Sequence, residues 1–439
     1  MSRKIGFWSV FALVTGSQIG TGVFMLPAAL APFGIMSLGG WVISGLGAVM
    51  LALVFAKLCS QFPRTGGPHA YVQAMFGNSA AFFTGWTYWV ISWVSTCAVI
   101  TGCIGYLSPL IGDHPPFVDL ILEIVLLLMI TAVNFRGVKV AGNVEFFLTA
   151  LKTIPLLLVP VAALFFFKPS NFAVIEHVSS PWDLSQMLSH VALLTLWGFV
   201  GLESATTPAG SVENPAKTIP RAVVMGTLFV AILYVINSIS IMGATPASVL
   251  ATSKAPYADT ARFIFGGNWH LGISLIAAIV CIGTLNAWML ASGQIALGVA
   301  QDGLMPAIFA RKNKHGAPWW ALLISCAGIV PLLFLTQDQN LAHQVNTIID
   351  FSVTAFLFVY GICCLAYLKM LYQSQKSSFL QWLCGLIALS FCIWVIAATP
   401  AKTLLISSGF TLSGLPIYWF RRQQFKRASL PIEAEAISL

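Results

Sequence analysis

Charged side chains are scarce in this chain of 439 residues, of which they make up only 8%. Soluble domains carry roughly 25% charged residues. This deficit excludes a water-soluble globule with a polar shell, because 58% of the residues are hydrophobic. The composition therefore predicts an integral membrane protein.

Motifs for metal binding and nucleophilic catalysis are also missing. No HExxH occurs, and the seven histidines are scattered, which argues against a membrane enzyme. The nine cysteines lie mostly inside apolar blocks without metal-ligand spacing, as Cys97 and Cys281 do, and are read as reduced core residues. The first apolar segment has no small-residue cleavage site, so we expect it to be retained. We predict neither a cofactor nor a metal.

Long apolar blocks are what the chain has in abundance. Each is about 20 residues or longer, enough for a helix to cross a hydrocarbon core of about 30 Å. The short alternating strands of an outer-membrane barrel are absent. We predict a single all-α polytopic domain over 1–439. Its twelve expected spans are 7–31, 36–60, 79–108, 116–134, 144–167, 189–209, 221–243, 269–300, 318–336, 341–370, 378–398 and 401–420.

Positive charge is distributed unevenly between the predicted loops. Seventeen Lys and Arg residues fall on the side of the N-terminus and four on the opposite side. This bias predicts a cytoplasmic membrane protein with both termini in the cytoplasm. The net charge of +8 then lies where anionic membrane lipid attracts it, and nucleic acid is not an expected partner.

Two of the predicted spans contain helix-breaking sequences. The first span includes GSQIGTGVFM at 16–25, and the sixth contains TLWGFVGLESATTPAG. We predict that the backbone around Gly20 to Gly22 and from Gly198 to Glu203 is non-helical and lines one central cavity. If the first five spans are repeated in inverted orientation by the next five, these two are equivalent. Paired interruptions of this kind indicate a transporter binding site near the membrane midplane. The alternative is that the glycines only allow close helix packing.

An interrupted helix can bind both ends of an α-amino acid. Unpaired N–H groups at the start of the second half-helix attract a carboxylate, while freed carbonyls accept an ammonium group. A small amino acid or amine is therefore the expected substrate. A channel or an amino acid sensor remains open, because the residues alone do not distinguish them from a transporter; both would lack stoichiometric counterflow.

Several motifs resemble one known family. QIGTGVFMLPAAL, TGGPHAYV, TLWGFVGLESA followed by VENPAKTIPRA, and DGLMPAIFARKNKHGAP occur in consistent order along nearly the whole chain. They are similar to the amino acid, polyamine and organocation superfamily, and within it to the basic amino acid and polyamine antiporters, typified by the arginine:agmatine exchanger. The resemblance implies a five-plus-five inverted repeat, with repeats at about 7–167 and 189–370, two extra helices at about 378–420, a basic cytoplasmic tail at 421–439, and a homodimer.

The resemblance also implies substrate-binding positions. Gly20, Thr21 and Gly22 would receive the substrate carboxylate; glycine admits close approach to the backbone and Thr21 adds a hydroxyl donor. The other implied positions are Gln18, Ile19, Ser92, Thr96, Trp197, Val200, Gly201, Trp288 and Ser352. Thr96 stands where the arginine exchanger has an asparagine, so the substrate is not specified as arginine.

Glu203 is the only acid in the middle of the sixth span. An ionisable group at this depth is costly and functional by default, so we expect it to exchange a proton during transport. The family has a proton-sensitive gating glutamate here, and the resemblance places Tyr88 and Tyr360 at gating positions. The alternative is a neutral acid hydrogen-bonded to the broken backbone.

Lys152 in the fifth span departs from the antiporters, which usually have an apolar residue there. Proton-coupled amino acid permeases of the same superfamily resemble this sequence at that point, with a lysine whose ammonium replaces a sodium ion between spans one, five and eight. Lys152 could instead extend to the membrane interface. Two transport modes therefore stay open, exchange and proton symport, and the motifs favour exchange of a basic amino acid for its decarboxylated amine or a related amino acid.

Overall fold

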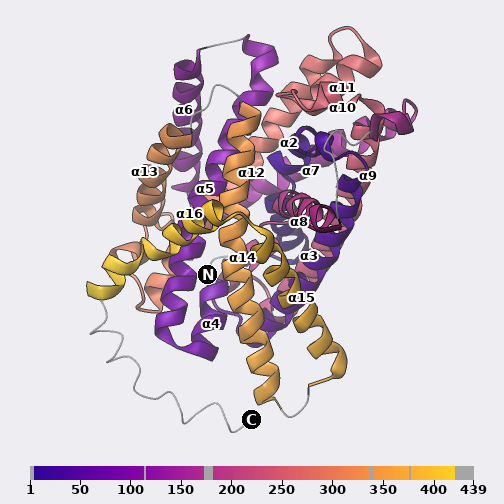
Figure 1. Cartoon of the computed structure of the whole chain (residues 1–439). Coiled ribbons are helices and arrows are strands. Elements are labelled where there is room, and N and C mark those ends of the chain that lie inside the picture. Colours follow the sequence, from indigo (N-terminus) through magenta and orange to yellow (C-terminus); the bar gives the residue numbers. More distant parts are fainter. Residues whose placement is uncertain (1–3, 113–114, 173–180, 337–340, 375–376, 421–439) are drawn as a thin grey trace.

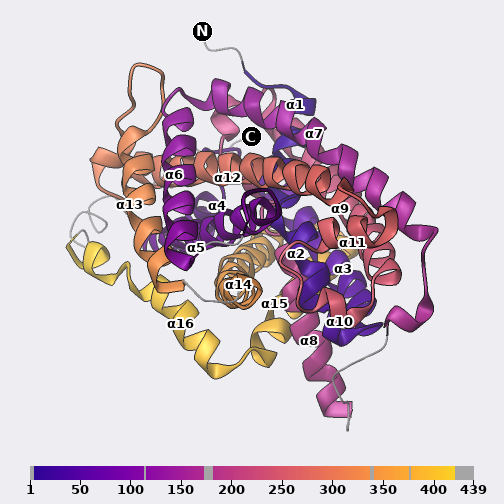
Figure 2. The ribbon, with the colours of Figure 1, turned by 90° about the horizontal axis from the view of Figure 1, so that it is seen from above.

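Helices make up the protein's architecture (Figures 1 and 2). The computed structural model describes residues 4–112, 115–172, 181–336, 341–374 and 377–420. Within these ranges the only β-type pairing is an isolated bridge between Ile5 and Val212. Eight helical segments of the described chain are long and apolar enough to cross a membrane. The prediction of an all-α, multi-pass protein is therefore confirmed.

The helices follow the predicted order along the chain. Their bounds are α1 (Phe7–Gln18), α2 (Thr21–Leu30), α3 (Met36–Gln61), α4 (Pro68–Phe76), α5 (Asn78–Ile111), α6 (Pro116–Asn134), α7 (Val138–Leu164), α8 (Pro181–Trp197), α9 (Pro215–Ala244), α10 (Ala247–Leu250), α11 (Pro256–Phe265), α12 (Trp269–Gln301), α13 (Trp319–Thr336), α14 (Leu341–Gln373), α15 (Phe379–Ala398) and α16 (Ala401–Leu412). Short 3-10 turns η1 to η5 join some of them. Every predicted span thus overlaps a helix.

Several sequence-based boundaries are wrong: α7 and α9 each begin six residues before their predicted spans, and the largest differences fall on the sixth and last spans. The sixth span was expected over 189–209, but α8 begins at Pro181, which occupies the first turn as proline often does, with Asp183 beside it near the positive helix end. α8 also ends early, at Trp197. The last span is not one continuous helix, because α16 ends at Leu412 before a turn.

Connections that were expected to be loops contain helices as well. α10 and α11 lie in the connection between the predicted spans 221–243 and 269–300, and α4 follows the second span. α4 begins at Pro68, directly after Gly66 and Gly67, whose positive φ values of +103° and +73° suit glycine and turn the chain sharply. These helices are too short or too polar for a search based on apolar blocks.

Helices five predicted spans apart pack against each other. α3 lies along α9, α5 along α12, and α6 along α13. Figure 2 shows α14 near the middle of the bundle, with α15 and α16 towards its rim. This arrangement brings α1, α2 and the end of α8 together beside α5 and α12, where the candidate site lies.

Candidate functional site

The first chain break separates α1 from α2. Ile19 is extended, with φ −75° and ψ 93°, and Gly20 has φ −142° and ψ −146°. The expectation that Gly20 to Gly22 are all non-helical is wrong for Thr21 and Gly22, which form the first turn of α2. Their position has a chemical consequence, because N–H groups in a first turn lack intrahelical partners and lie at the positive end of the helix.

The second break follows α8. Residues 198–203 form turns, and the chain then continues as the 3-10 turn η3 (Ser204–Thr206). Gly201 has a φ of +103°, a left-handed conformation that strongly favours glycine. The prediction of a non-helical backbone from Gly198 to Glu203 is therefore confirmed.

The two breaks lie directly against each other. A Cβ atom built on Gly22 would lie 3.3 Å from the Cα of Gly198. Ser17 donates to the carbonyl of Gly201 over 3.0 Å, and its Oγ lies 2.6 Å from Oγ of Ser204. Small residues thus allow backbone contact, and a buried hydroxyl pair joins the two interrupted segments.

Hydroxyl groups from two other helices bind the carbonyls that the first break releases. Tyr234 of α9 donates to the carbonyl of Gln18 over 2.6 Å, and Thr284 of α12 donates to that of Ile19 over 2.9 Å. A Cβ on Gly20 would come within 2.5 Å of Thr284 Cγ2. Buried backbone carbonyls require hydrogen-bond partners, and these two side chains supply them, so the surrounding helices stabilise the break.

A small cavity lies between the two breaks. Its volume is about 10 Å³, comparable to the space that one water molecule needs. It is lined by Ser17, Gln18, Gly20, Thr21, Gly22, Ser95, Val99, Trp197, Val200, Thr284 and Trp288. Thr21 Oγ1 is buried there without a hydrogen-bond partner among the described residues. An amino acid fits only if the surrounding segments move, so this conformation is nearly closed around the cavity.

The structure brings together most of the predicted binding positions, with one shift on α5. Ser92 and Thr96 do not line this cavity: Ser92 donates to the carbonyl of Trp89, and Thr96 to that of Ser92. Ser95 and Val99, one helical turn apart, face it instead. Ser352 of α14 reaches the cavity edge through a hydrogen bond between its hydroxyl and that of Ser95.

Four lining residues were missed in the sequence: Ser17, Ser95, Val99 and Thr284. Ser17 precedes the first break, and Thr284 lies four residues before Trp288 on α12. That spacing puts Thr284 and Trp288 on one helix face, which is the signal that could have found it. Ser95 gave no such signal, because the face of α5 that carries Ser92 and Thr96 is equally polar.

Glu203 connects the second break to two helices. Its side chain is fully buried and accepts hydrogen bonds from Tyr88 of α5 over 2.9 Å and from Tyr360 of α14 over 2.6 Å. Phe356 links this group to the cavity, since its ring centroid lies 5.9 Å from those of Tyr88 and Tyr360 and 5.6 Å from that of Trp288. One carboxyl group thus joins both tyrosines that were predicted as gates.

Lys152 is part of α7, and its side chain lies outside the described residues. α7 itself packs against α1 and α12. All nine cysteines are buried, as expected for core residues. Among the residues that the structure describes, no cluster of His, Cys, Asp and Glu could hold a metal ion.

Known proteins match this chain over almost its whole length. The model of the amino acid permease family matches residues 5–420. A putative arginine/ornithine antiporter of Bacillus subtilis (strain 168) is 29% identical over 465 residues, covering 97% of this chain and 98% of the relative. The cadaverine/lysine antiporter of Escherichia coli (strain K12) is 29% identical over 440 residues, or 98% and 97% of the two chains.

A third relative is the putrescine transporter PotE of Escherichia coli (strain K12), which is 30% identical over 361 residues, or 82% of each chain. These relatives are transporters of amino acids or amines rather than enzymes. The matched region contains both chain breaks and the cavity between them. The chain belongs to the amino acid permease family of the amino acid, polyamine and organocation superfamily and is a multi-pass membrane transporter.

Proposed function

We propose that this protein exchanges a basic amino acid for its decarboxylated amine, or for a related amino acid, by alternating access. The proposal includes the twelve membrane spans, the five-plus-five inverted repeat over about 7–167 and 189–370, and termini in the cytoplasm of a cell with an inner membrane. It also includes a homodimer, with 378–420 outside the repeat. The pairwise packing of α3 with α9, α5 with α12 and α6 with α13 supports the repeat.

The contact between the two chain breaks carries the proposal. Thr21 and Gly22 border the cavity in the first turn of α2, where N–H groups lack intrahelical partners and attract a carboxylate once the cavity opens. The unpartnered hydroxyl of Thr21 offers one more donor. Trp197 and Trp288 border the same cavity, and the face of an indole ring attracts a cationic side chain by about 0.5–2 kcal/mol.

Exchange requires the nearly closed cavity to open towards each side of the membrane in turn. Glu203 is placed to take part, because its two tyrosine bonds hold α5 and α14 against the second break. Breaking those bonds would release α14 from residues 198–203. Proton uptake and release by Glu203 then offers one means of linking pH to opening.

The test is transport by the purified protein in proteoliposomes. Vesicles preloaded with lysine, ornithine, arginine or the corresponding amine, and matched empty vesicles, receive an external radiolabelled substrate. Exchange predicts uptake into preloaded vesicles only, without a pH gradient. Equal uptake into empty vesicles would overturn exchange as the mode of transport.

Proton-coupled symport is the second candidate, and the placement of α7 favours it. α7 carries Lys152 and packs against α12 and against α1, the helix that ends at the first break. An ammonium group on α7 could respond to proton binding there and so couple uptake to a pH gradient. Uptake into empty vesicles that occurs only with an inward proton gradient would select this mode.

A further inference from the structure

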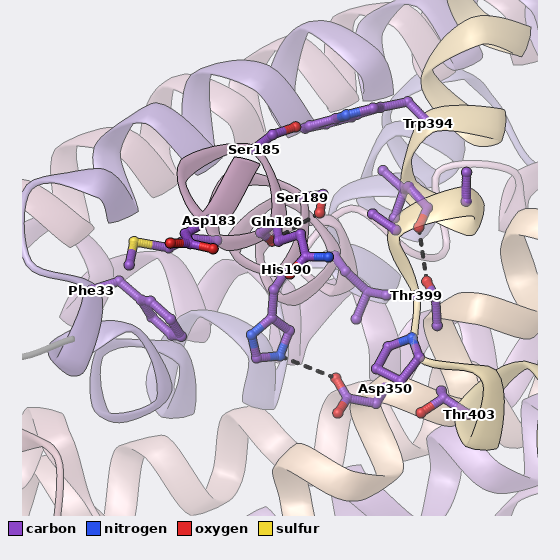
Figure 3. Close-up of a pocket in the computed structure, with 16 residues that line it drawn as sticks. Phe33, Asp183, Ser185, Gln186, Ser189, His190, Asp350, Trp394, Thr399 and Thr403 are labelled. Atoms are coloured by element: carbon purple, nitrogen blue, oxygen red, sulfur yellow. Dashed lines mark hydrogen bonds and ion pairs between the residues drawn. The ribbon is translucent and has the colours of Figure 1, made fainter. Parts of the chain in front are cut away.

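A second and larger cavity lies away from the chain breaks, between α8, α14 and the connection from α15 to α16 (Figure 3). Its volume is about 670 Å³, within the range of about 300–1,000 Å³ that is typical of sites for small ligands. No residue lines both this cavity and the central cavity between the chain breaks. Its chemistry therefore requires a separate explanation.

The titratable groups on the wall of this second cavity, called the outer cavity because it lies away from the chain breaks, are predominantly acidic. Asp183 and Asp350 contribute carboxyl groups and His190 an imidazole, while none of the described lining residues is Lys or Arg. A negatively charged, partly enclosed wall attracts cations and repels anions. An anionic lipid headgroup is thus a poor occupant.

Asp350 has an unsatisfied oxygen at this wall. Its Oδ1 atom is buried and has no hydrogen-bond partner among the described residues. Among the described residues, the imidazole of His190 faces it, with Nε2 3.9 Å from that oxygen, beyond hydrogen-bond distance. A buried carboxylate oxygen without a donor is costly. Because the Asp350 side chain as a whole is 32% exposed, a rotation of its carboxyl group would let the N–H of an ammonium group in the cavity satisfy this oxygen.

Apolar and aromatic groups complete the cavity. Phe33 packs edge to face on His190 with ring centroids 5.6 Å apart, and Figure 3 shows Phe33 and Asp350 on opposite sides of the imidazole. Trp394 and Leu193 also line the space. Such walls suit an alkyl chain, and an aromatic face adds attraction for a cation.

We propose that the outer cavity is an accessory binding site for a small alkylammonium ion, with Asp350 as its counter-ion. The site goes beyond the proposed exchange reaction and depends on neither transport mode. Its occupant would bridge α8 and α14. These helices also carry Trp197 and Ser352, so the outer cavity and the central cavity share two helices.

The proposal is tested by equilibrium binding of radiolabelled pentylamine to the full chain in lipid nanodiscs. The proposed exchange also brings an amine to the central cavity, so binding is measured in parallel in Trp288→Leu, which alters the central cavity and leaves the outer one intact. Asp350→Asn should weaken binding about 10- to 100-fold, as expected for loss of a hydrogen bond to a charged group. Asp119→Asn, which removes a carboxylate from the first turn of α6, is the matched control and should bind like the parent.

A second variant fills the cavity without changing its charge. Ala397 lines the outer cavity and is exposed, so Ala397→Trp should block pentylamine while the protein elutes as a single folded species. This variant decides the question if Asp350→Asn fails to fold. Undiminished binding in Ala397→Trp would overturn the site. If 1-pentanol displaced radiolabelled pentylamine as well as unlabelled pentylamine does, the role of charge would be overturned. If Trp288→Leu rather than Ala397→Trp lost binding, the amine would lie in the central cavity.

Discussion

Gly22 and Gly198 are in backbone contact, although 175 residues separate them: a Cβ on Gly22 would lie 3.3 Å from the Cα of Gly198. The contact joins the two interrupted segments where each leaves its helix. A side chain on Gly22 would press on Gly198, and a side chain on Gly198 would press on Tyr234 and Trp41. The geometry of the central cavity therefore depends on glycine at both positions.

Gly198→Ala should impair both transport and stability. The added Cβ would lie 2.7 Å from Cε2 of Tyr234 and 3.2 Å from Trp41, and overpacking of this kind typically costs about 1–3 kcal/mol. It would also strain the Tyr234 bond to the first break. We expect a lower thermal unfolding temperature in detergent and slower exchange. Gly272→Ala is the control, because its Cβ meets nothing within 4 Å; equal behaviour of the two variants would refute the argument.

Replacement of either cavity tryptophan should weaken substrate binding. Trp197→Leu and Trp288→Leu remove an aromatic face from the cavity wall, and loss of a cation–π contact of about 0.5–2 kcal/mol predicts a KM about 2- to 30-fold higher. Phenylalanine should be tolerated better than leucine, because it keeps an aromatic face. Trp8→Leu provides a control, since Trp8 is 70% exposed. Exchange kinetics unchanged in both leucine variants would identify the rings as packing residues only.

The positions of the two chain breaks could be predicted from the sequence, but the helix ends beside them and the cavity-facing side of α5 could not. Gly, Pro and Glu inside apolar blocks mark an interrupted helix, because each is unfavourable in a continuous membrane helix. The exact ends of α8 and the 3-10 turns after it depend on tertiary contacts, such as the bond from Ser17 to Gly201. The rotation of α5 that presents Ser95 rather than Ser92 is likewise a packing outcome, and no periodicity distinguishes these two faces.

Glu203→Gln should flatten the dependence of exchange on pH while leaving part of the activity. The amide is isosteric but cannot lose or gain a proton in this range, and its NH₂ group cannot accept the hydrogen bond that either Tyr88 or Tyr360 now donates. One tyrosine would therefore lose its acceptor. The measurement is the initial rate of counterflow across a series of pH values equal on both sides of the membrane.

Tyr360→Phe separates the two roles of that carboxyl group. It removes the 2.6 Å hydrogen bond but keeps the ionisable acid, so exchange should slow while its pH dependence persists. If Glu203→Gln retains the pH profile of the parent, a different group must titrate during transport, and Glu203 would be a structural link between helices.

The last prediction distinguishes the two transport modes through Lys152. If its ammonium group responds to protons beside the first break, Lys152→Ala should abolish uptake driven by a pH gradient into empty vesicles and leave counterflow measurable. Lys152→Arg keeps a positive charge that does not titrate at these pH values, so it should also fail to couple uptake to the gradient. Lys168→Ala, on the connection after α7, removes a lysine without touching α7 and is the matched control. Should Lys152→Ala transport like the parent at every pH, with and without a gradient, the symport interpretation would fall, and exchange without proton coupling would stand as the mode.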